Sequence, residues 1–371
     1  DMLPEISSAM LVVTHRCNLE CRYCFVKQKN EDMDLATARE AARFLAGNAR
    51  RAGTAPAINF FGGEPMLRWE GLLRPLAREI RAEGRPFRLS VTTNGTLLTE
   101  ERMEEMHRLG FGLLLSMDGA QGVQDANRPF HGGGGSFERL ERVIPGALRR
   151  WPGVTLRMTA APWSCGGLFE SIRWAEGMGF RSFFVIPDVF SRWDGGSWGA
   201  LEREVMRYAG YVRSRREAGR AYIRFSALEG ALDDADKLRT AEGRASLAAR
   251  GRAENKCGLG AGRFASIAPD GGIYACQELC SNAGPESPFY IGSLAGGVSE
   301  ERRRALMAEY FSERPRGEAG CGGCPYEGAC DGGCAANNYF AAGRVNILPA
   351  AYCRWKRLLL RAAERIKEGE G

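Results

Sequence analysis

The distribution of the twelve cysteines constrains this 371-residue chain more than any other feature of its sequence. Three of them lie between residues 17 and 24, Cys165 stands alone, and eight lie between residues 257 and 353. Grouped cysteines are typical of metal sites, whereas a disulfide framework belongs to oxidising compartments. No apolar stretch approaches the roughly 18 residues of a membrane span, and no secretory leader opens the chain. We therefore expect a cytoplasmic protein with reduced, metal-binding thiols and no membrane partner.

The composition fits an ordinary folded protein with two domains. Hydrophobic residues make up 44% and charged residues 26% of the chain, which is enough for a sizeable core. The 51 Lys and Arg exceed the 45 Asp and Glu, and because the net charge of +6 is spread along the chain, we expect no nucleic-acid partner. We place a larger domain at residues 1–230, a charged, Ala-rich linker at 231–256 and a cysteine-rich domain with a C-terminal helix at 257–371.

Short apolar runs alternate with longer amphipathic stretches in the first half of the chain, which indicates βα units and a parallel sheet. Six units fall short of the eight of a complete (β/α)8 barrel, so we expect an α/β fold with an open, partial (β/α)6 barrel of TIM type. The expected strands are residues 10–14, 57–61, 88–93, 112–117, 155–160 and 182–186. The expected helices include residues 35–51, 100–109, 137–150, 168–178, 202–216 and 354–367.

Cys17, Cys21 and Cys24 directly follow the first expected strand in a Cys-x3-Cys-x2-Cys pattern. Active sites of barrel folds lie at the carboxyl ends of the strands, so this loop lies where chemistry is expected. Three thiolates with no fourth cysteine nearby leave one iron of a 4Fe-4S cluster open to a small molecule. A three-thiolate zinc site and a purely structural cluster are the alternatives.

Together with Asn18, Leu19 and Tyr23, this triad resembles the defining motif of the radical S-adenosylmethionine superfamily. Motifs at the ends of the next three expected strands strengthen the resemblance, which implies S-adenosylmethionine as cofactor. In the family, a GGEP segment binds the methionine amino group, later positions surround the ribose and carboxylate, and the aromatic residue of the triad lies near the adenine. The cofactor contacts implied here are Tyr23, Gly62, Gly63, Glu64, Pro65, Thr93, Asn94, Ser116 and Asp118.

The same resemblance implies a reaction. An external one-electron donor supplies the electron that cleaves S-adenosylmethionine to a 5′-deoxyadenosyl radical at the catalytic triad. The radical abstracts a hydrogen atom from the substrate, and the barrel contributes by holding that hydrogen close and excluding quenching groups.

The C-terminal cysteines resemble a SPASM domain, which holds two auxiliary 4Fe-4S clusters in peptide-modifying members of the superfamily. They run as Cys-x13-Gly-x4-Cys and then Cys-x2-Cys-x5-Cys-x3-Cys-x18-Cys. Three 4Fe-4S clusters are thus implied for the chain, and two zinc ribbons are the alternative for the C-terminal cysteines. Cys280 either completes the first auxiliary cluster or leaves it with an open iron. The other implied ligands are Cys257, Cys276 and Cys334 for the first auxiliary cluster, and Cys321, Cys324, Cys330 and Cys353 for the second.

The resemblance also implies a ribosomally made, cysteine-containing peptide as substrate. Sulfatase-maturing relatives carry an Asp base after the second cysteine of the first auxiliary site, where this chain has Gln277, which argues against that activity. Residues 127–130 and 330–339 are similar to maturases that cross-link cysteine-containing peptides. We expect a thioether or other cross-link. Ser or Cys oxidation, and a non-catalytic electron-transfer or scaffold protein, are the alternatives. Many such maturases carry an N-terminal peptide-recognition domain, so we expect a missing N-terminal domain or a separate leader-recognition protein.

Three other residues lie near the expected mouth of the barrel. Arg157, on the fifth expected strand, either binds the cofactor carboxylate or forms a structural ion pair. Cys165 is expected to be a buried free thiol. His15 precedes the triad, and we expect it to be solvated or to support the triad.

Overall fold

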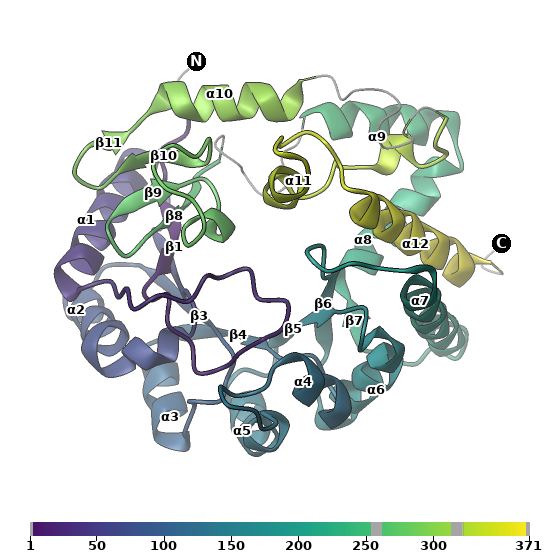
Figure 1. Cartoon of the computed structure of the whole chain (residues 1–371), viewed down its shortest axis with the longest axis horizontal. Coiled ribbons are helices and arrows are strands. Elements are labelled where there is room, and N and C mark those ends of the chain that lie inside the picture. The colour runs from purple at the N-terminus through teal and green to yellow at the C-terminus, as the bar shows by residue number, and fades with distance from the viewer. Residues whose placement is uncertain (1–2, 254–261, 313–320, 322, 369–371) are drawn as a thin grey trace.

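Seven parallel strands lie side by side in chain order in the computed structural model, which describes residues 3–253, 262–312, 321 and 323–368 (Figure 1). The six expected strands are confirmed to within two residues. The seventh has only two residues, which is too short to show a hydrophobic period. The strands are β1 (Ser8–Val12), β2 (Ala57–Phe61), β3 (Arg88–Thr93), β4 (Phe111–Ser116), β5 (Thr155–Ala160), β6 (Ser182–Pro187) and β7 (Arg224–Phe225).

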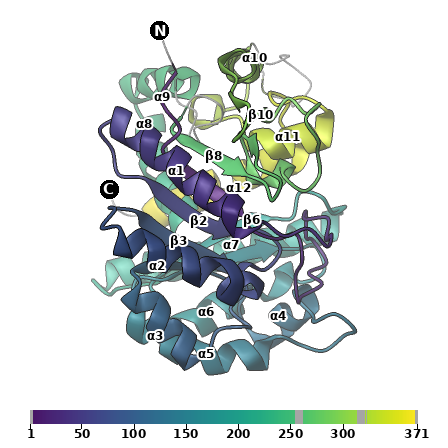
Figure 2. The same ribbon diagram turned by 90° about the vertical axis from the view of Figure 1, so that its left-hand side faces the viewer.

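Helices connect these strands and cover the outer face of the curved sheet (Figures 1 and 2). In the first of them, Asp34 accepts a hydrogen bond from the Thr37 N–H and caps the N-terminus. Its Ala38, Ala41 and Leu45 are buried at the spacing of one helix face. Among the described residues, no helix is long and apolar enough to cross a membrane. The helices are α1 (Leu35–Arg51), α2 (Arg74–Ala82), α3 (Glu100–Arg108), α4 (Gln121–Asn127), α5 (Phe137–Arg150), α6 (Leu168–Met178) and α7 (Gly195–Glu217).

The C-terminal part of the chain extends the same sheet. β8 (Phe264–Ile267) pairs in parallel with β1, on the edge that β2 does not occupy. A partial barrel leaves this edge open, and β8 satisfies its backbone hydrogen bonds. The described strands therefore run in the order β11-β10-β9-β8-β1-β2-β3-β4-β5-β6-β7, and the predicted α/β fold with an open partial barrel is confirmed. The remaining elements are β9 (Gly272–Tyr274), β10 (Tyr290–Ser293), β11 (Gly297–Val298), α10 (Glu300–Phe311), α11 (Ala335–Ala342) and α12 (Ala350–Lys367).

The stretch expected to be a linker, residues 231–256, is helical in its described part except at residues 239 and 240. α8 (Ser226–Leu238) and α9 (Ala241–Ala253) occupy it, and residues 254–256 lie outside the described residues. α8 buries Leu232 and Ala235 and packs against α12. Alanine and charged residues favour a helix as much as a linker, so composition alone did not distinguish the two.

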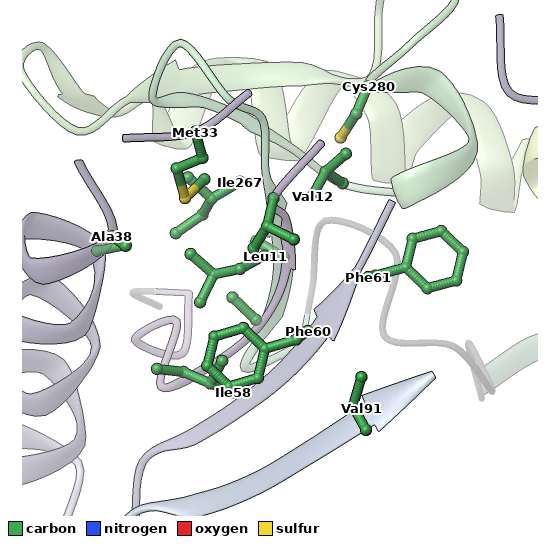
Figure 3. Close-up of a cluster of buried hydrophobic side chains, with 14 of the residues drawn as sticks. Leu11, Val12, Met33, Ala38, Ile58, Phe60, Phe61, Val91, Ile267 and Cys280 are labelled. Carbon is green, nitrogen blue, oxygen red and sulfur yellow. The ribbon is translucent and has the colours of Figure 1, made fainter. Parts of the chain in front are cut away.

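Apolar side chains from both parts of the chain share one buried cluster (Figure 3). Leu11, Ile58, Phe60 and Val91 from the first three strands pack with Ile267 from β8, and each is at most 1% exposed. Burial of an aliphatic or Phe side chain contributes roughly 1.5–3 kcal/mol. This shared core holds the C-terminal strands against the barrel.

Candidate active site

One cavity brings together the triad loop (residues 17–24), the ends of five parallel strands and the C-terminal part of the chain. Its space, including the opening to solvent, is about 990 Å³, which suits a ligand of nucleotide size. The cavity lies at the carboxyl ends of the strands, as barrel folds place their active sites. Its lining includes Cys17, Cys21, Tyr23 and Cys24 from the triad loop, Gly62 and Gly63 after β2, Thr92 and Thr93 of β3, Asn94 directly after it, Ser116 of β4, Arg157 and Thr159 of β5, Asp188 and Phe190 after β6, and Glu278 and Asn337.

The three triad thiols fit an iron–sulfur cluster. Burial raises the pKa of Cys17 to about 12 and that of Cys21 to about 11, and it also raises the pKa of Cys24. A bound metal overrides this effect because coordination deprotonates a thiol. No three His, Cys, Asp or Glu side chains in the described part of the chain are placed to hold one metal ion. A cubane binds each thiolate through a different iron, so three thiols on one loop are chemically able to hold a cluster.

Gly62 and Gly63 allow the segment after β2 to lie directly against the triad loop. Gly62 has a φ of +142°, and a Cβ there would lie 2.2 Å from the carbonyl oxygen of Thr14. A Cβ at Gly63 would lie 2.1 Å from the carbonyl oxygen of Arg16. The double glycine therefore permits a close backbone approach that no side chain would allow.

Glu64 and Pro65 lie behind the cavity wall and do not line the cavity. The Glu64 carboxylate, 0% exposed, accepts hydrogen bonds from Thr93 Oγ1 at 2.7 Å and from the Asn94 N–H at 2.8 Å. It also accepts one from the Met66 N–H at 2.9 Å. Burial raises the pKa of Glu64 to about 7 despite these bonds. Glu64 thus joins the ends of β2 and β3 and shapes the wall from behind.

Asn94 connects the end of β3 to the triad loop. Its Nδ2 donates to Asn18 Oδ1 at 2.9 Å, and its Oδ1 accepts from Thr96 Oγ1 at 2.7 Å. Asn18 Nδ2 in turn donates to Thr96 Oγ1 at 2.8 Å. The three side chains form a small network beside Cys17, whose Sγ lies 3.8 Å from Asn94 Nδ2.

Asp118, an implied cofactor contact, is 1% exposed and does not line the cavity. Its carboxylate pairs with Arg128 at 3.1 and 3.2 Å and accepts hydrogen bonds from the Tyr23 hydroxyl, from Asn127 Nδ2 at 3.0 Å and from the Thr159 N–H at 2.8 Å. Both of its oxygens are therefore engaged within the protein. The sequence indicated the segment of Arg128 only by its similarity to maturases. It did not indicate the ion pair, because the pairing depends on the tertiary fold.

Arg157 lies in the cavity wall, and the Arg157 guanidinium has no ion pair or hydrogen bond with the described residues. Burial lowers its pKa, and nearby Glu278 opposes that shift. Glu278 is 8% exposed, and within the described part of the chain its Oε2 has no hydrogen-bond partner. A free guanidinium on one wall suits the carboxylate of a ligand. Glu278 was not identified from the sequence. It follows Gln277 directly, but nothing in the neighbouring sequence indicates that it lines this cavity.

Three C-terminal cysteines lie near Arg357, and a fourth lies near one of these three. Negative charge on Cys353, Cys324 and Cys321 raises the pKa of Arg357, and Cys330 lies close enough to raise the pKa of Cys353, which burial raises most. Although these thiols come from a span of 33 positions, the fold brings them together. They are the set that the sequence implied for the second auxiliary cluster.

The set expected for the first auxiliary cluster is described in part, because Cys257 lies outside the described residues. Cys276 and Cys334 both lie near Arg157, where their charge would raise its pKa. Cys280 is buried beside Val12 (Figure 3) and lines a second, polar cavity, while its Sγ lies 3.8 Å from the Cys276 carbonyl oxygen. A ligand role for Cys280 stays a prediction.

Cys165 and His15 both lie away from the triad cavity. Cys165 is 3% exposed, and its thiol contacts the Pro162 and Ser197 carbonyl oxygens at 3.6 and 3.3 Å. His15 is buried rather than solvated, and its Nδ1 lies 3.0 Å from Glu31 Oε2. Cys165 is therefore the buried free thiol expected from the sequence.

Known proteins resemble this chain over its barrel in sequence and over nearly all of it in structure. Residues 11–162 match the sequence profile of the Radical SAM superfamily. The chain is 30% identical over 148 residues to an Fe-coproporphyrin III synthase of Methanosarcina barkeri, covering 40% of this chain and 35% of that protein. It is 34% identical over 137 residues to a serine-type anaerobic sulfatase-maturating enzyme of Klebsiella aerogenes, covering 34% of this chain and 33% of that protein. The chain thus spans less than half the length of the curated relatives it matches.

Two solved structures share the fold. Native anSMEcpe with bound AdoMet and Cp18Cys peptide superposes with a TM-score of 0.72 at 17% identity, covering 97% of this chain and 98% of that one. SuiB of Streptococcus suis bound to precursor peptide SuiA superposes with a TM-score of 0.60 at 15% identity, covering 94% and 76%. Residues 11–162 thus match the Radical SAM superfamily profile, and the fold of the chain as a whole resembles that of anSMEcpe and SuiB.

Proposed function

We propose that this chain is a radical S-adenosylmethionine enzyme that modifies a peptide. The observation that carries the proposal is the cavity in which three thiols, five strand ends and two C-terminal residues meet. A non-catalytic electron carrier has no need of a nucleotide-sized cavity beside its thiols.

The residues divide into those that would hold the cofactors and those that support them. When bound, a 4Fe-4S cluster and S-adenosylmethionine supply a carbon radical that removes hydrogen from a substrate. Three residues that do not line the cavity would support its wall: Glu64, Pro65 and Asp118. The cluster would be held by Cys17, Cys21 and Cys24, and S-adenosylmethionine by Tyr23, Gly62, Gly63, Thr93, Asn94, Ser116 and Arg157.

We also propose that the C-terminal cysteines hold two auxiliary 4Fe-4S clusters. Three thiols lie near Arg357 and the fourth lies near Cys353, which supports this set as the ligands of one of these clusters: Cys321, Cys324, Cys330 and Cys353. For the other we propose Cys257, Cys276 and Cys334, with Cys280 as the open question. Glu278 lies two positions from both Cys276 and Cys280 and lines the triad cavity, so the first auxiliary site would adjoin the substrate.

A peptide is the substrate class that the fold and the cavity mouth support. The two solved structures with this fold were determined with bound peptides. At the mouth, Phe190 is 47% exposed and its ring lies 5.4 Å from that of Phe340, which offers an apolar platform to an entering chain. We propose hydrogen abstraction from a cysteine-containing peptide and formation of a thioether. Oxidation of a Ser or Cys is the alternative, and Gln277 in place of an Asp base argues against it.

The first experiment tests the radical chemistry. The reconstituted, reduced protein is incubated with S-adenosylmethionine, and 5′-deoxyadenosine is measured by chromatography. We expect product from the native chain and from Cys165→Ala, which removes a thiol outside the cavity, but none from Cys17→Ala. Absence of product from the native chain would favour the electron-transfer alternative.

The second experiment tests the substrate. The chain is co-expressed with the small cysteine-bearing reading frame nearest its gene, and the peptide is analysed by mass spectrometry. Loss of two hydrogens together with thiols that resist alkylation supports a thioether. An unchanged mass counts against this peptide, and loss of two hydrogens with thiols still reactive favours another oxidation or cross-link.

A further inference from the structure

The segment 127–131, which we call the strap, runs along the triad loop. The Glu20 N–H donates to the Pro129 carbonyl oxygen at 2.9 Å, and the Arg22 N–H donates to that of Asn127 at 3.1 Å. Leu19 and Phe130 form an antiparallel bridge between the two segments. His131 Nε2 also lies 3.1 Å from the carbonyl oxygen of a triad cysteine. The strap thus holds the backbone of the triad loop from one side.

Arg128 joins the strap to Asp118. Its guanidinium is fixed by the two-pronged ion pair with Asp118, at 3.1 and 3.2 Å, and lies 5.3 Å from the centroid of the Tyr23 ring. Arg128 is 7% exposed and Asp118 is 1% exposed, so water screens neither charge. Asp118 is itself oriented by the Thr159 N–H at 2.8 Å. A guanidinium held in this way cannot turn away from the triad loop.

The guanidinium of Arg128 lies close to the triad thiols. Arg128 and Cys21 line the same cavity. Tyr23, whose ring centroid lies 5.3 Å from the guanidinium, is two positions after Cys21 and directly precedes Cys24. Because an arginine stays charged at every relevant pH, this is a permanent cation beside a thiolate. The reduction potential of an iron–sulfur cluster depends on nearby charge and on hydrogen bonds to its sulfurs.

We propose that Arg128 is a positioning residue that fixes the triad loop and raises the reduction potential of the cluster on the triad. The inference rests on the proposed function, since it requires that cluster. Reduction by an external donor adds one electron and one negative charge to the cluster. The guanidinium stabilises that added charge, which makes the electron easier to accept.

The test is a redox titration monitored by electron paramagnetic resonance, without peptide. The triad signal is identified as the one that Cys17→Ala removes. We expect Arg128→Gln to disfavour reduction at least tenfold, which for a one-electron couple is a potential lower by about 59 mV. Arg128→Lys, which keeps the charge, should remain near the native potential. Arg22→Gln, the matched control, removes an exposed charge next to Cys21 and should leave the potential unchanged.

Each outcome either supports or overturns the inference. A native potential in Arg128→Gln overturns the inference. An equal shift in Arg128→Gln and Arg128→Lys also overturns it, because it would show that the positive charge, which lysine keeps, has no effect on the potential. If Arg128→Gln does not fold, the double variant Asp118→Asn/Arg128→Gln leaves no unpaired buried charge. Because it removes one charge of each sign, we expect a smaller lowering of the potential, since Arg128 lines the cavity and Asp118 does not, and a native potential overturns the inference. A native chain without a triad signal overturns the proposed function as well, whereas a normal signal with an unshifted potential overturns this inference alone.

Discussion

Replacement of Glu64 by Gln should change how the stability of the protein depends on pH. Burial raises the pKa of Glu64 from 4.5 to about 7 in the folded chain. Below pH 4.5 the side chain is protonated in both states, so it adds no pH dependence. Between pH 4.5 and about 7, the unfolded chain loses the proton while the folded chain keeps it, so the free energy of unfolding falls as the pH rises. At about 1.4 kcal/mol per pH unit, the folded state loses about 3 kcal/mol relative to the unfolded state by pH 7 and above.

The assay is urea unfolding of the native chain and of Glu64→Gln at matched iron content, between pH 4.5 and 8. Glutamine fills the same space but cannot ionise, so the comparison cancels every other titrating group. The free energy of unfolding of the native chain, minus that of the variant, should fall by about 3 kcal/mol across this range. A difference that stays constant or rises with pH would refute the reasoning. It would mean that the donors from Thr93, Asn94 and Met66 hold the carboxylate ionised in spite of burial.

Three further predictions follow from packing and placement. Gly62→Ala should lower the free energy of unfolding by more than about 3 kcal/mol, since its Cβ would clash with backbone, whereas Gly122→Ala, in open space, should be neutral or stabilising in the same thermal melts. Phe60→Ala should cost about 3–5 kcal/mol in urea unfolding, because the side chain is fully buried. Cys280→Ala and Cys334→Ala should both lower the iron content of the native chain, and an unchanged content in Cys280→Ala would leave the first auxiliary cluster with an open iron. Equal iron loss in both variants would make Cys280 a ligand.

The elements of the barrel could be predicted from the sequence because their signals are local. The alternation of apolar runs with amphipathic stretches located six strands to within two residues and gave the bounds of α1, α5 and α6. The spacing of Cys17, Cys21 and Cys24 likewise required no knowledge of the fold, since residues three or four positions apart share a loop. What these signals could not give is the distance between segments that are far apart in the chain.

The βα pattern, the triad and the grouping of the C-terminal cysteines could be read from the chain alone, because each depends on neighbours along the chain. Three other features became visible in the folded molecule: β8 completes the open edge of β1, Asp118 pairs with Arg128, and Glu278 lines the triad cavity. These contacts join segments whose sequences carry no mark of one another. They follow from the burial of one shared core, which brings the C-terminal strands against the barrel and fixes which side chains meet at its mouth.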